Sequence, residues 1–190
     1  MSNINLRKMM ALKAEPLFRM DNTVVIDSIH PLQQRMMDFY RTNPRCVIHA
    51  PRRSGKSILL IMQAMLSDKH VDIVVGKQTM VNHMKSELYR FCADNDIEYV
   101  SSSNGLIVND RNVRIVTYSQ LEYHSERQYH LDNDTAYMFD EYLFNRTIRL
   151  PLHDIDNVLL IGTPFGDLND ALNPDYTGVF AALIVNDGDE

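Results

Sequence analysis

Four short stretches of the chain consist almost entirely of hydrophobic residues and are bounded by polar or turn-forming residues. They lie at 45–50, 71–76, 136–142 and 157–164. Strands that are buried on both faces of a sheet have this pattern, because both sets of alternating side chains contact apolar layers. We therefore expect four buried strands, and the stretch at 157–164 is expected to be the final one.

Hydrophobic residues recur every three or four positions in segments between these stretches. This spacing predicts one helix over 55–66 and another over 79–92, for which Thr79 is a candidate N-cap. An earlier helix is expected to follow Gln33. Its predicted apolar face consists of Met36, Met37 and Tyr40.

The order of the predicted elements indicates the fold. Segment 105–118 is expected to be a β-hairpin around Asn-Asp-Arg-Asn. Elsewhere strands alternate with helices, which predicts an α/β fold with a mostly parallel sheet and helices on both faces. With 190 residues, 45% of them hydrophobic, the chain is long enough for one core. We expect a single domain, an N-terminal extension at 1–29 and an acidic tail at 166–190.

Residues 49–57, HAPRRSGKS, follow the first predicted strand and open the helix expected at 55–66. They match the phosphate-binding template G-x-x-x-x-G-K-[ST], except that Ala50 replaces the first glycine. In such a loop, backbone N–H groups bind phosphate oxygens. Lys56 is expected to contact the β- and γ-phosphates of ATP, and Ser57 to ligate Mg²⁺. The residues expected to bind the nucleotide are Ala50, Pro51, Arg52, Arg53, Ser54, Gly55, Lys56 and Ser57.

Two acidic residues, Asp140 and Glu141, end the predicted strand at 136–142. Asp140 is expected to hold a water molecule of the Mg²⁺ ion. Because neighbouring side chains of a strand point in opposite directions, Glu141 is expected to face the γ-phosphate. A carboxylate there orients and polarises the attacking water. Without a preceding phosphate loop, the same pair would indicate a solvated acidic turn.

Two further polar residues are candidates for contacts with the nucleotide. Thr163 follows a buried strand in LLIGTP and is expected to sense whether the γ-phosphate is present. Gln33, in HPLQQRMMDFY, has an amide that offers both the donor and the acceptor needed to read the N6/N7 edge of adenine. Gln34 is an alternative for the same role.

In this order, Pro-x-Gln, APRRSGKS, FDEY and IGTP resemble the ATPase domain of large terminase subunits, the motors that package DNA into viral capsids. The similarity is greatest to terminases of tailed bacteriophages and covers about residues 28–165. It includes the segment DIVVGKQTMVNHMKSELYRF, which resembles a strand and helix of that family. The resemblance implies a P-loop NTPase fold of the RecA-like (ASCE) class. It also implies Mg²⁺-dependent ATP hydrolysis coupled to translocation of double-stranded DNA into a procapsid.

The resemblance also implies a role for the two arginines of the loop. Large terminases commonly carry an arginine finger in cis, which neutralises the charge that develops on the γ-phosphate. Arg52 and Arg53 both match that position, and the sequence leaves open which of them performs the role. Such an arginine is worth about 10³–10⁵ in rate. The catalytic residues implied are therefore Glu141 and one of these two arginines.

Partners and location follow from the same resemblance. We expect a portal protein and a small terminase subunit as partners, and a homo-oligomeric ring once the motor assembles on a procapsid in the host cytoplasm. In isolation the protein is expected to be monomeric. Large terminases normally continue into a nuclease domain, whereas nothing at 166–190 resembles one. The nuclease is therefore expected to be a separate protein, a domain outside the given sequence, or not part of this system, and the sequence leaves these alternatives open. No apolar run is long enough to predict a membrane span.

Charge is distributed unevenly along the chain. Residues 1–57 contain ten Lys and Arg against four Asp and Glu, and residues 58–190 contain nine against twenty-one. The net charge of −6 argues against a general nucleic-acid coat, while the basic first third either faces phosphates or packs against the acidic remainder.

Two other functions stay open. A superfamily 2 helicase fragment shares the main motifs but requires a second lobe for its arginine finger, and an ATP-binding scaffold has no need of Glu141.

Overall fold

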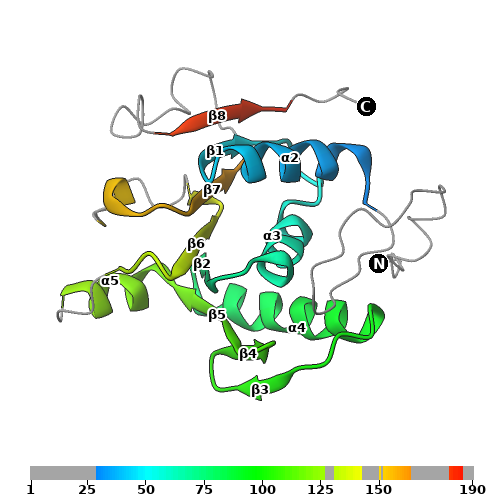
Figure 1. The fold of residues 1–190 in the computed structure, drawn as a ribbon, viewed down its shortest axis with the longest axis vertical. Helices are drawn as coiled ribbons and strands as arrows, with labels where there is room; N and C mark the ends of the chain where they lie inside the picture. Colours follow the sequence, from blue (N-terminus) through cyan, green and yellow to red (C-terminus); the bar gives the residue numbers. More distant parts are fainter. Residues whose placement is uncertain (1–28, 127–130, 143–149, 151, 164–179, 186–190) are drawn as a thin grey trace.

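The computed structural model describes residues 29–126, 131–142, 150, 152–163 and 180–185. Within them, eight strands form one sheet in the order β3-β4-β5-β2-β6-β7-β1-β8 (Figure 1). Neighbouring strands are parallel except in the β3–β4 and β4–β5 pairs. The strands are β1 (Arg45–His49), β2 (His70–Val75), β3 (Val100–Ser102), β4 (Gly105–Val108), β5 (Arg111–Thr117), β6 (Thr135–Asp140), β7 (Val158–Gly162) and β8 (Ala181–Ile184).

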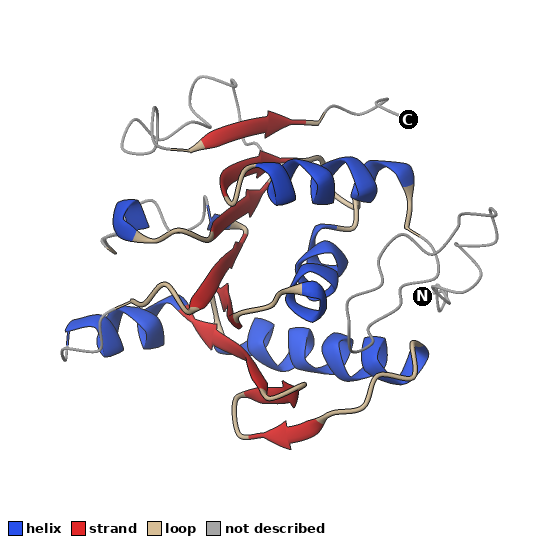
Figure 2. Ribbon diagram, in the orientation of Figure 1, coloured by secondary structure: helices blue, strands red, loops and turns tan. Residues whose placement is uncertain are grey.

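Helices cover the two faces of the sheet unequally. Three of them, α2, α3 and α4, lie on one face, and α5 and the short 3-10 helix η2 lie on the other (Figures 1 and 2). Their bounds are α2 (Pro31–Thr42), α3 (Lys56–Leu66), α4 (Gln78–Asp94), α5 (Tyr118–Glu126) and η2 (Leu152–Asp154). The predicted α/β fold with a mostly parallel sheet is therefore confirmed. Among the described residues, no helix has both the length and the hydrophobicity needed to cross a membrane.

Each face of the sheet has its own layer of buried hydrophobic side chains. In β1, Cys46 and Ile48 belong to the layer under α2, α3 and α4, whereas Val47 belongs to the layer under α5 and η2. Both faces of the strand are thus covered, which explains its nearly unbroken apolar sequence. The predicted apolar face of α2 is buried in the first layer, and it consists of Met36, Met37 and Tyr40.

The predicted hairpin at 105–118 is confirmed. β4 and β5 pair in antiparallel orientation and are joined by Asn109 and Asp110, which have φ values of 49° and 62°. Asn and Asp tolerate this left-handed conformation better than most residues, and a two-residue turn of this kind matches the twist of a hairpin. β3 adds a third antiparallel strand at the edge of the sheet.

Two predictions about helix starts are wrong. Lys77, not Thr79, is the N-cap of α4, because the backbone N–H of residue 81 already donates to the carbonyl of Lys77. Gln33 does not precede α2 but lies in its first turn. That helix begins at Pro31, whose fixed φ and missing N–H suit a first helical position.

The strand at 157–164 is not the final one. β8 follows it, within the segment expected to be an acidic tail, and pairs in parallel with the outer side of β1. The backbone N–H of Val185 extends this pairing by donating to the carbonyl of His49. Residues 166–179 and 186–190, and the expected extension at 1–29 apart from Ile29, lie outside the described residues.

The strand order decides which loops meet. β7 lies between β1 and β6, and the three strands are parallel, so their carboxyl ends lie side by side at one edge of the sheet. Ligands of open α/β sheets bind at this edge. The loop after β1, the acids at the end of β6 and Thr163 after β7 are therefore neighbours, although 22 to 107 residues separate them in the chain.

Candidate nucleotide-binding site

The loop between β1 and α3 contains two residues with positive φ, Arg53 at 67° and Gly55 at 82°. The positive φ favours a glycine at position 55. A Cβ atom there would also lie 2.2 Å from Nε2 of Gln33, so the end of the Gln33 side chain would have to move away. Ala50 is not among the described residues with positive φ. Alanine in place of the first glycine of the template therefore causes no left-handed strain in this loop.

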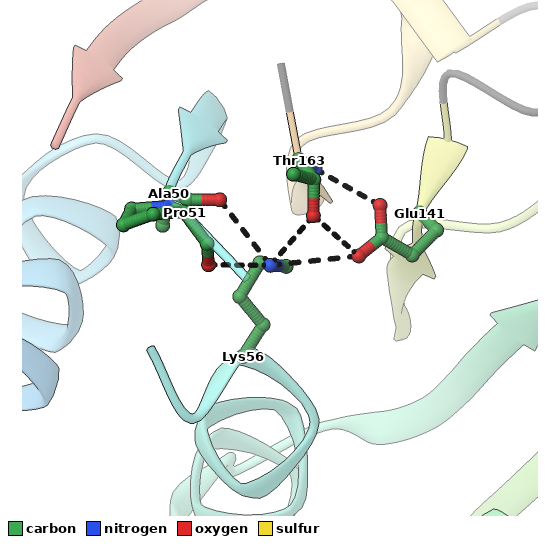
Figure 3. A network of polar contacts seen from close by, with 5 residues as sticks. All are labelled: Ala50, Pro51, Lys56, Glu141 and Thr163. Atoms are coloured by element: carbon green, nitrogen blue, oxygen red, sulfur yellow. Dashed lines mark hydrogen bonds and ion pairs between the residues drawn. The ribbon is translucent and has the colours of Figure 1, made fainter. Parts of the chain in front are cut away.

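Lys56, the first residue of α3, is only 7% exposed. Its Nζ donates hydrogen bonds to the carbonyl oxygens of Ala50 (3.2 Å) and Pro51 (2.9 Å) and to Oγ1 of Thr163 (2.9 Å) (Figure 3). Oε1 of Glu141 lies 3.5 Å from the same nitrogen. An ammonium group has three N–H donors, so each donor has a partner and the buried charge is compensated.

Glu141 contacts Thr163 through both carboxylate oxygens. The backbone N–H of Thr163 donates to Oε2 and its hydroxyl donates to Oε1, each at 2.9 Å (Figure 3). Glu141 has a φ of 50° and lies beyond β6, which ends at Asp140. The expected strand alternation is therefore not the reason for its direction. The left-handed backbone, which non-glycine residues rarely adopt, directs the carboxylate toward β7.

Asp140, the residue before Glu141, is 6% exposed. The pKa of its carboxyl is raised to about 6, mainly by burial and also by the charge of Glu141, whereas Lys56 and a hydrogen bond from the Ser57 hydroxyl oppose the shift. A serine hydroxyl beside a carboxylate is a set of hard oxygen ligands that fits Mg²⁺. No group of three or more His, Cys, Asp or Glu among the described residues is placed to hold a metal ion. The Ser57 hydroxyl and the Asp140 carboxylate fit a Mg²⁺ ion that takes its remaining ligands from phosphates and water.

The two candidate glutamines differ in their surroundings. Gln33 is 9% exposed, and its Nε2 lies 3.5 Å from the carbonyl oxygen of Gly55. Gln34 instead donates to Oδ1 of Asp38 in its own helix, at 2.9 Å. The structure thus brings Gln33, and not Gln34, into contact with the phosphate loop.

The rest of the loop is more open to solvent. Arg52 and Arg53 are both exposed. Ser54 is half-buried, and its Oγ has no hydrogen-bond partner among the described residues although that atom is buried. Buried hydroxyl groups normally have a partner, so this oxygen is available to a ligand in the loop. Together with the N-terminus of α3, these residues fit the phosphates of a nucleotide.

Sequence reasoning missed two residues beside the network. His49 is the last residue of β1, and Tyr142 follows Glu141; both are buried and their side chains are hydrogen-bonded to each other. The available signal was a histidine inside an apolar strand. Its partner, however, is 93 positions away in the sequence.

A separate cavity of about 300 Å³ lies at the amino ends of β1 and β7, away from the candidate site. Its lining includes Pro44, which precedes β1, Ser67, which ends α3, and Asn157, which precedes β7. None of the residues expected to bind nucleotide lines it. This cavity and the candidate chemistry thus lie at different ends of the strands.

Comparison with known proteins reveals similarity of fold but not of sequence. No protein-family model matches the chain, and no curated protein matches it. Among solved structures, the UvsW helicase from bacteriophage T4 superimposes with a TM-score of 0.58 at 17% identity, covering 84% of this chain and 61% of the helicase. The large terminase ATPase domain of Thermus phage P74-26 superimposes with a TM-score of 0.52 at 13% identity, covering 83% and 81%. The N-terminal domain of the DNA packaging ATPase from bacteriophage phi29 gives 0.47 at 13%, covering 78% and 83%.

The first two similarities, together with the strand order, show that the chain has the α/β fold of P-loop NTPases. The chain spans about three fifths of the length of the T4 helicase, at 61%. At identities below 20%, the shared property is the fold. Function has to be argued from the residues of the site.

Proposed function

We propose that this protein is an ATP-hydrolysing motor of the kind found in large terminases, which translocates double-stranded DNA into a viral procapsid. The observation that carries the proposal is the contact of Lys56, Glu141 and Thr163 at the adjoining carboxyl ends of β1, β6 and β7. A cation, a candidate base and a hydroxyl within bonding distance of one another, beside a phosphate-type loop, suit phosphoryl transfer to water.

Binding of ATP uses residues of the loop and the start of α3. The backbone N–H groups around Gly55 and the unpartnered hydroxyl of Ser54 receive phosphate oxygens. Lys56 exchanges its carbonyl partners for oxygens of the β- and γ-phosphates. Gln33 reads adenine, and its contact with Gly55 supports a position at the nucleotide rather than in solvent.

Hydrolysis requires four side chains in the proposed mechanism. Glu141 orients a water molecule, whose oxygen forms the new bond to the γ-phosphorus while the bond to the bridging oxygen of ADP breaks. Arg52 or Arg53 stabilises the charge that develops on the phosphoryl oxygens. Mg²⁺ supplies additional positive charge at the β- and γ-phosphates, and Ser57 and Asp140 are the residues that would hold it.

Thr163 links binding to hydrolysis. Its hydroxyl accepts a hydrogen bond from Lys56 and donates one to Glu141. When a γ-phosphate binds Lys56, the hydrogen bond between Lys56 and Thr163 breaks, and the Glu141 carboxylate becomes available to water. Thr163 directly follows β7, so its change in hydrogen bonding also affects that strand.

DNA is the proposed cargo, which suits the two similar solved structures with the higher TM-scores named above, since they are, by their names, a helicase and the ATPase domain of a large terminase. Arg52 and Arg53 at the nucleotide edge and Lys77 after β2 are exposed cations at the carboxyl ends of the strands. A portal, a small terminase subunit and a separate nuclease domain or protein complete the proposed assembly. The subunits form a ring when assembled in the host cytoplasm and are monomers in isolation.

ATP turnover by the full chain, measured with and without double-stranded DNA, tests this proposal. We expect Mg²⁺-dependent turnover that double-stranded DNA stimulates, together with displacement of the third strand from a DNA triplex. The matched control is Glu141→Gln, which keeps the size of the side chain and is expected to bind ATP without hydrolysing it. No turnover under any of these conditions, with ATP bound, would instead indicate an ATP-binding scaffold.

A superfamily 2 helicase fragment is the second candidate, because the T4 helicase has the higher TM-score of the two similar structures. The two motors differ in what they do to DNA. A helicase fragment separates the strands of a forked duplex, whereas a packaging motor moves along an intact duplex. Strand separation without triplex displacement would favour the helicase.

A further inference from the structure

His49 and Tyr142 form a buried aromatic pair on the face of the sheet that carries α5 and η2. Nε2 of His49 is hydrogen-bonded to the hydroxyl of Tyr142, and the rings are stacked with centroids 5.7 Å apart and planes inclined by 18°. Their exposed fractions are 1% and 3%. The pair is therefore inside the protein, and solvent and substrate do not touch it.

The pair bridges two strands that are not neighbours. β7 separates β1 from β6, and strands are about 4.8 Å apart, so the two backbones are separated by about twice that distance. In β7, the residue paired with His49 is Gly162, which has no side chain. The absence of a side chain there leaves room for two rings to meet over the strand. The result is a direct link between the end of β1 and the residue after Glu141.

The chain needs such a link at this point because Glu141 has a left-handed backbone. A non-glycine residue with a φ of 50° is strained by about 1–2 kcal/mol and keeps that conformation only when its surroundings fix it. β6 fixes the residue before Glu141. Tyr142, buried in the same hydrophobic layer as Val47 and Phe139, fixes the residue after it.

If the pair served only to stabilise the fold, its polar atoms would be unfavourable. Nδ1 of His49 is buried and has no hydrogen-bond partner among the described residues. Burial also lowers the pKa of His49, so the imidazole is neutral near pH 7. Two apolar rings would fill the same space without leaving a nitrogen unpaired. The hydrogen bond, however, fixes the distance between β1 and residue 142, which apolar contact does not do.

We infer that His49 and Tyr142 are a positioning pair that holds the Glu141 carboxylate in register with the phosphate loop. His49 is joined to Ala50, whose carbonyl accepts from Lys56, and Tyr142 is joined to Glu141, which accepts from Thr163. The hydrogen bond between the rings thus connects the loop that receives phosphate with the group that orients water. This inference rests on the proposed ATPase function for its catalytic consequence, but not for its structural one.

Tyr142→Phe is the direct test, because it removes the hydroxyl and keeps the ring. We expect kcat to fall about tenfold or more, since small displacements of a catalytic group are costly. KM for ATP should stay close to the wild-type value, whereas the midpoint of unfolding should fall modestly, because the change leaves Nε2 of His49 buried without its partner. In a Glu141→Gln background the same change should cause no further loss, because the pair acts through Glu141. The matched control is Tyr89→Phe, which removes a hydroxyl that donates to Gly105 far from the site and should leave kcat unchanged.

A second measurement does not depend on turnover. The amide of Thr163 donates to Glu141, so its hydrogen-exchange rate in the nucleotide-free protein reports the placement of that carboxylate. In Tyr142→Phe this rate should rise about tenfold, the size expected for weakening one hydrogen bond. The control amide is that of Thr117, which also donates to a side chain, Oε1 of Gln120, and should not change.

The outcomes separate the two hypotheses. Unchanged exchange at Thr163 in Tyr142→Phe would overturn the positioning role, whether or not the protein hydrolyses ATP. Faster exchange in a protein that shows no ATP turnover would support the positioning role and contradict the proposed function. A fall in kcat that is as large in the Glu141→Gln background as in the wild type would also overturn it, because the pair would then act independently of Glu141.

Discussion

The ion pair Asp72–Arg114 and the charged network around Lys56 both include buried charges, but their surroundings differ. Asp72 and Arg114 face each other in register on the adjacent strands β2 and β5. Arg114 donates to both carboxylate oxygens, from Nε at 2.7 Å and from a terminal nitrogen at 2.6 Å. The Asp72 side chain is 2% exposed, while that of Arg114 is half exposed. One cation therefore compensates one anion, and the backbone of both is regular strand.

In the network at the carboxyl ends of β1, β6 and β7, positive and negative charges are not paired one to one. One ammonium group, that of Lys56, faces two consecutive carboxylates, and Glu141 has a left-handed backbone. The loop beside it has a further residue with positive φ in Arg53. The comparison teaches that the ion pair is a complete structural contact. The network has an excess of negative charge and stored strain, as expected of a site that receives a metal ion and a ligand.

The largest effect is expected at the arginines, which belong to the strained region. Replacing the arginine finger, Arg52 or Arg53, by Ala should lower ATP turnover about 10³–10⁵-fold and leave nucleotide affinity mostly intact. Replacing the other one should have a milder effect. Arg53→Gly is a second variant for deciding between Arg52 and Arg53. It removes the guanidinium group of Arg53, as the Ala variant does, but glycine relieves the positive φ at that position. Turnover and nucleotide affinity of the purified variants provide the measurement, and normal hydrolysis by both Ala variants would exclude a finger in cis.

The next prediction compares a carboxylate of the network, Glu141, with a carboxylate of the ion pair, Asp72. Glu141→Gln should reduce turnover by about 10²–10⁴, because an amide does not polarise water as a carboxylate does. Asp72→Asn, the same chemical change in the ion pair, should leave turnover per folded molecule unchanged. ATP binding should persist in both variants. Similar turnover in Glu141→Gln and wild type would remove Glu141 from the mechanism.

Loss of the Asp72–Arg114 ion pair should affect the stability of the protein rather than its ATP turnover. Arg114→Met leaves the carboxylate of Asp72 buried without its partner, which should lower the free energy of unfolding by about 3 kcal/mol. Burial already raises the pKa of Asp72, and loss of Arg114 removes the main opposing influence, so the variant should be relatively more stable at low pH. Denaturant unfolding at several pH values gives the measurement. A variant as stable as wild type at pH 7 would show that the pair is not a structural contact.

The last effect concerns Asp140. Because its pKa is raised from 3.8 to about 6, mainly by burial, ionisation of Asp140 costs stability as the pH rises from about 4 to about 6. Asp140→Asn stays neutral, so the nucleotide-free variant should become more stable than wild type by about 3 kcal/mol above that range. Near pH 4 the two should be equal. The variant should gain less stability than wild type from Mg²⁺ and ATP, and an equal gain would argue against Asp140 as a metal-binding group.

Much of the fold was predictable from local pattern. The apolar runs of β1, β2, β6 and β7, the hairpin of β4 and β5 and the buried face of α2 were all predicted and are confirmed. Each depends on periodicity or turn chemistry over a few residues, which is written in the sequence itself. The edge strands β3 and β8 were not predicted, since β3 has three residues and β8 is only partly buried, which leaves weak patterns.

The candidate site was predictable as a set of residues but not as an arrangement. The sequence by itself determined that a glycine, a lysine and a serine open α3 and that two acids end β6, because loop chemistry and strand ends are local properties. Only the tertiary structure decided that β7 lies between β1 and β6, that Glu141 turns toward Thr163 through a left-handed backbone, and that His49 reaches Tyr142 over Gly162. These features depend on contacts between residues 22 to 107 positions apart, and such contacts form only when separate strands pack into one sheet.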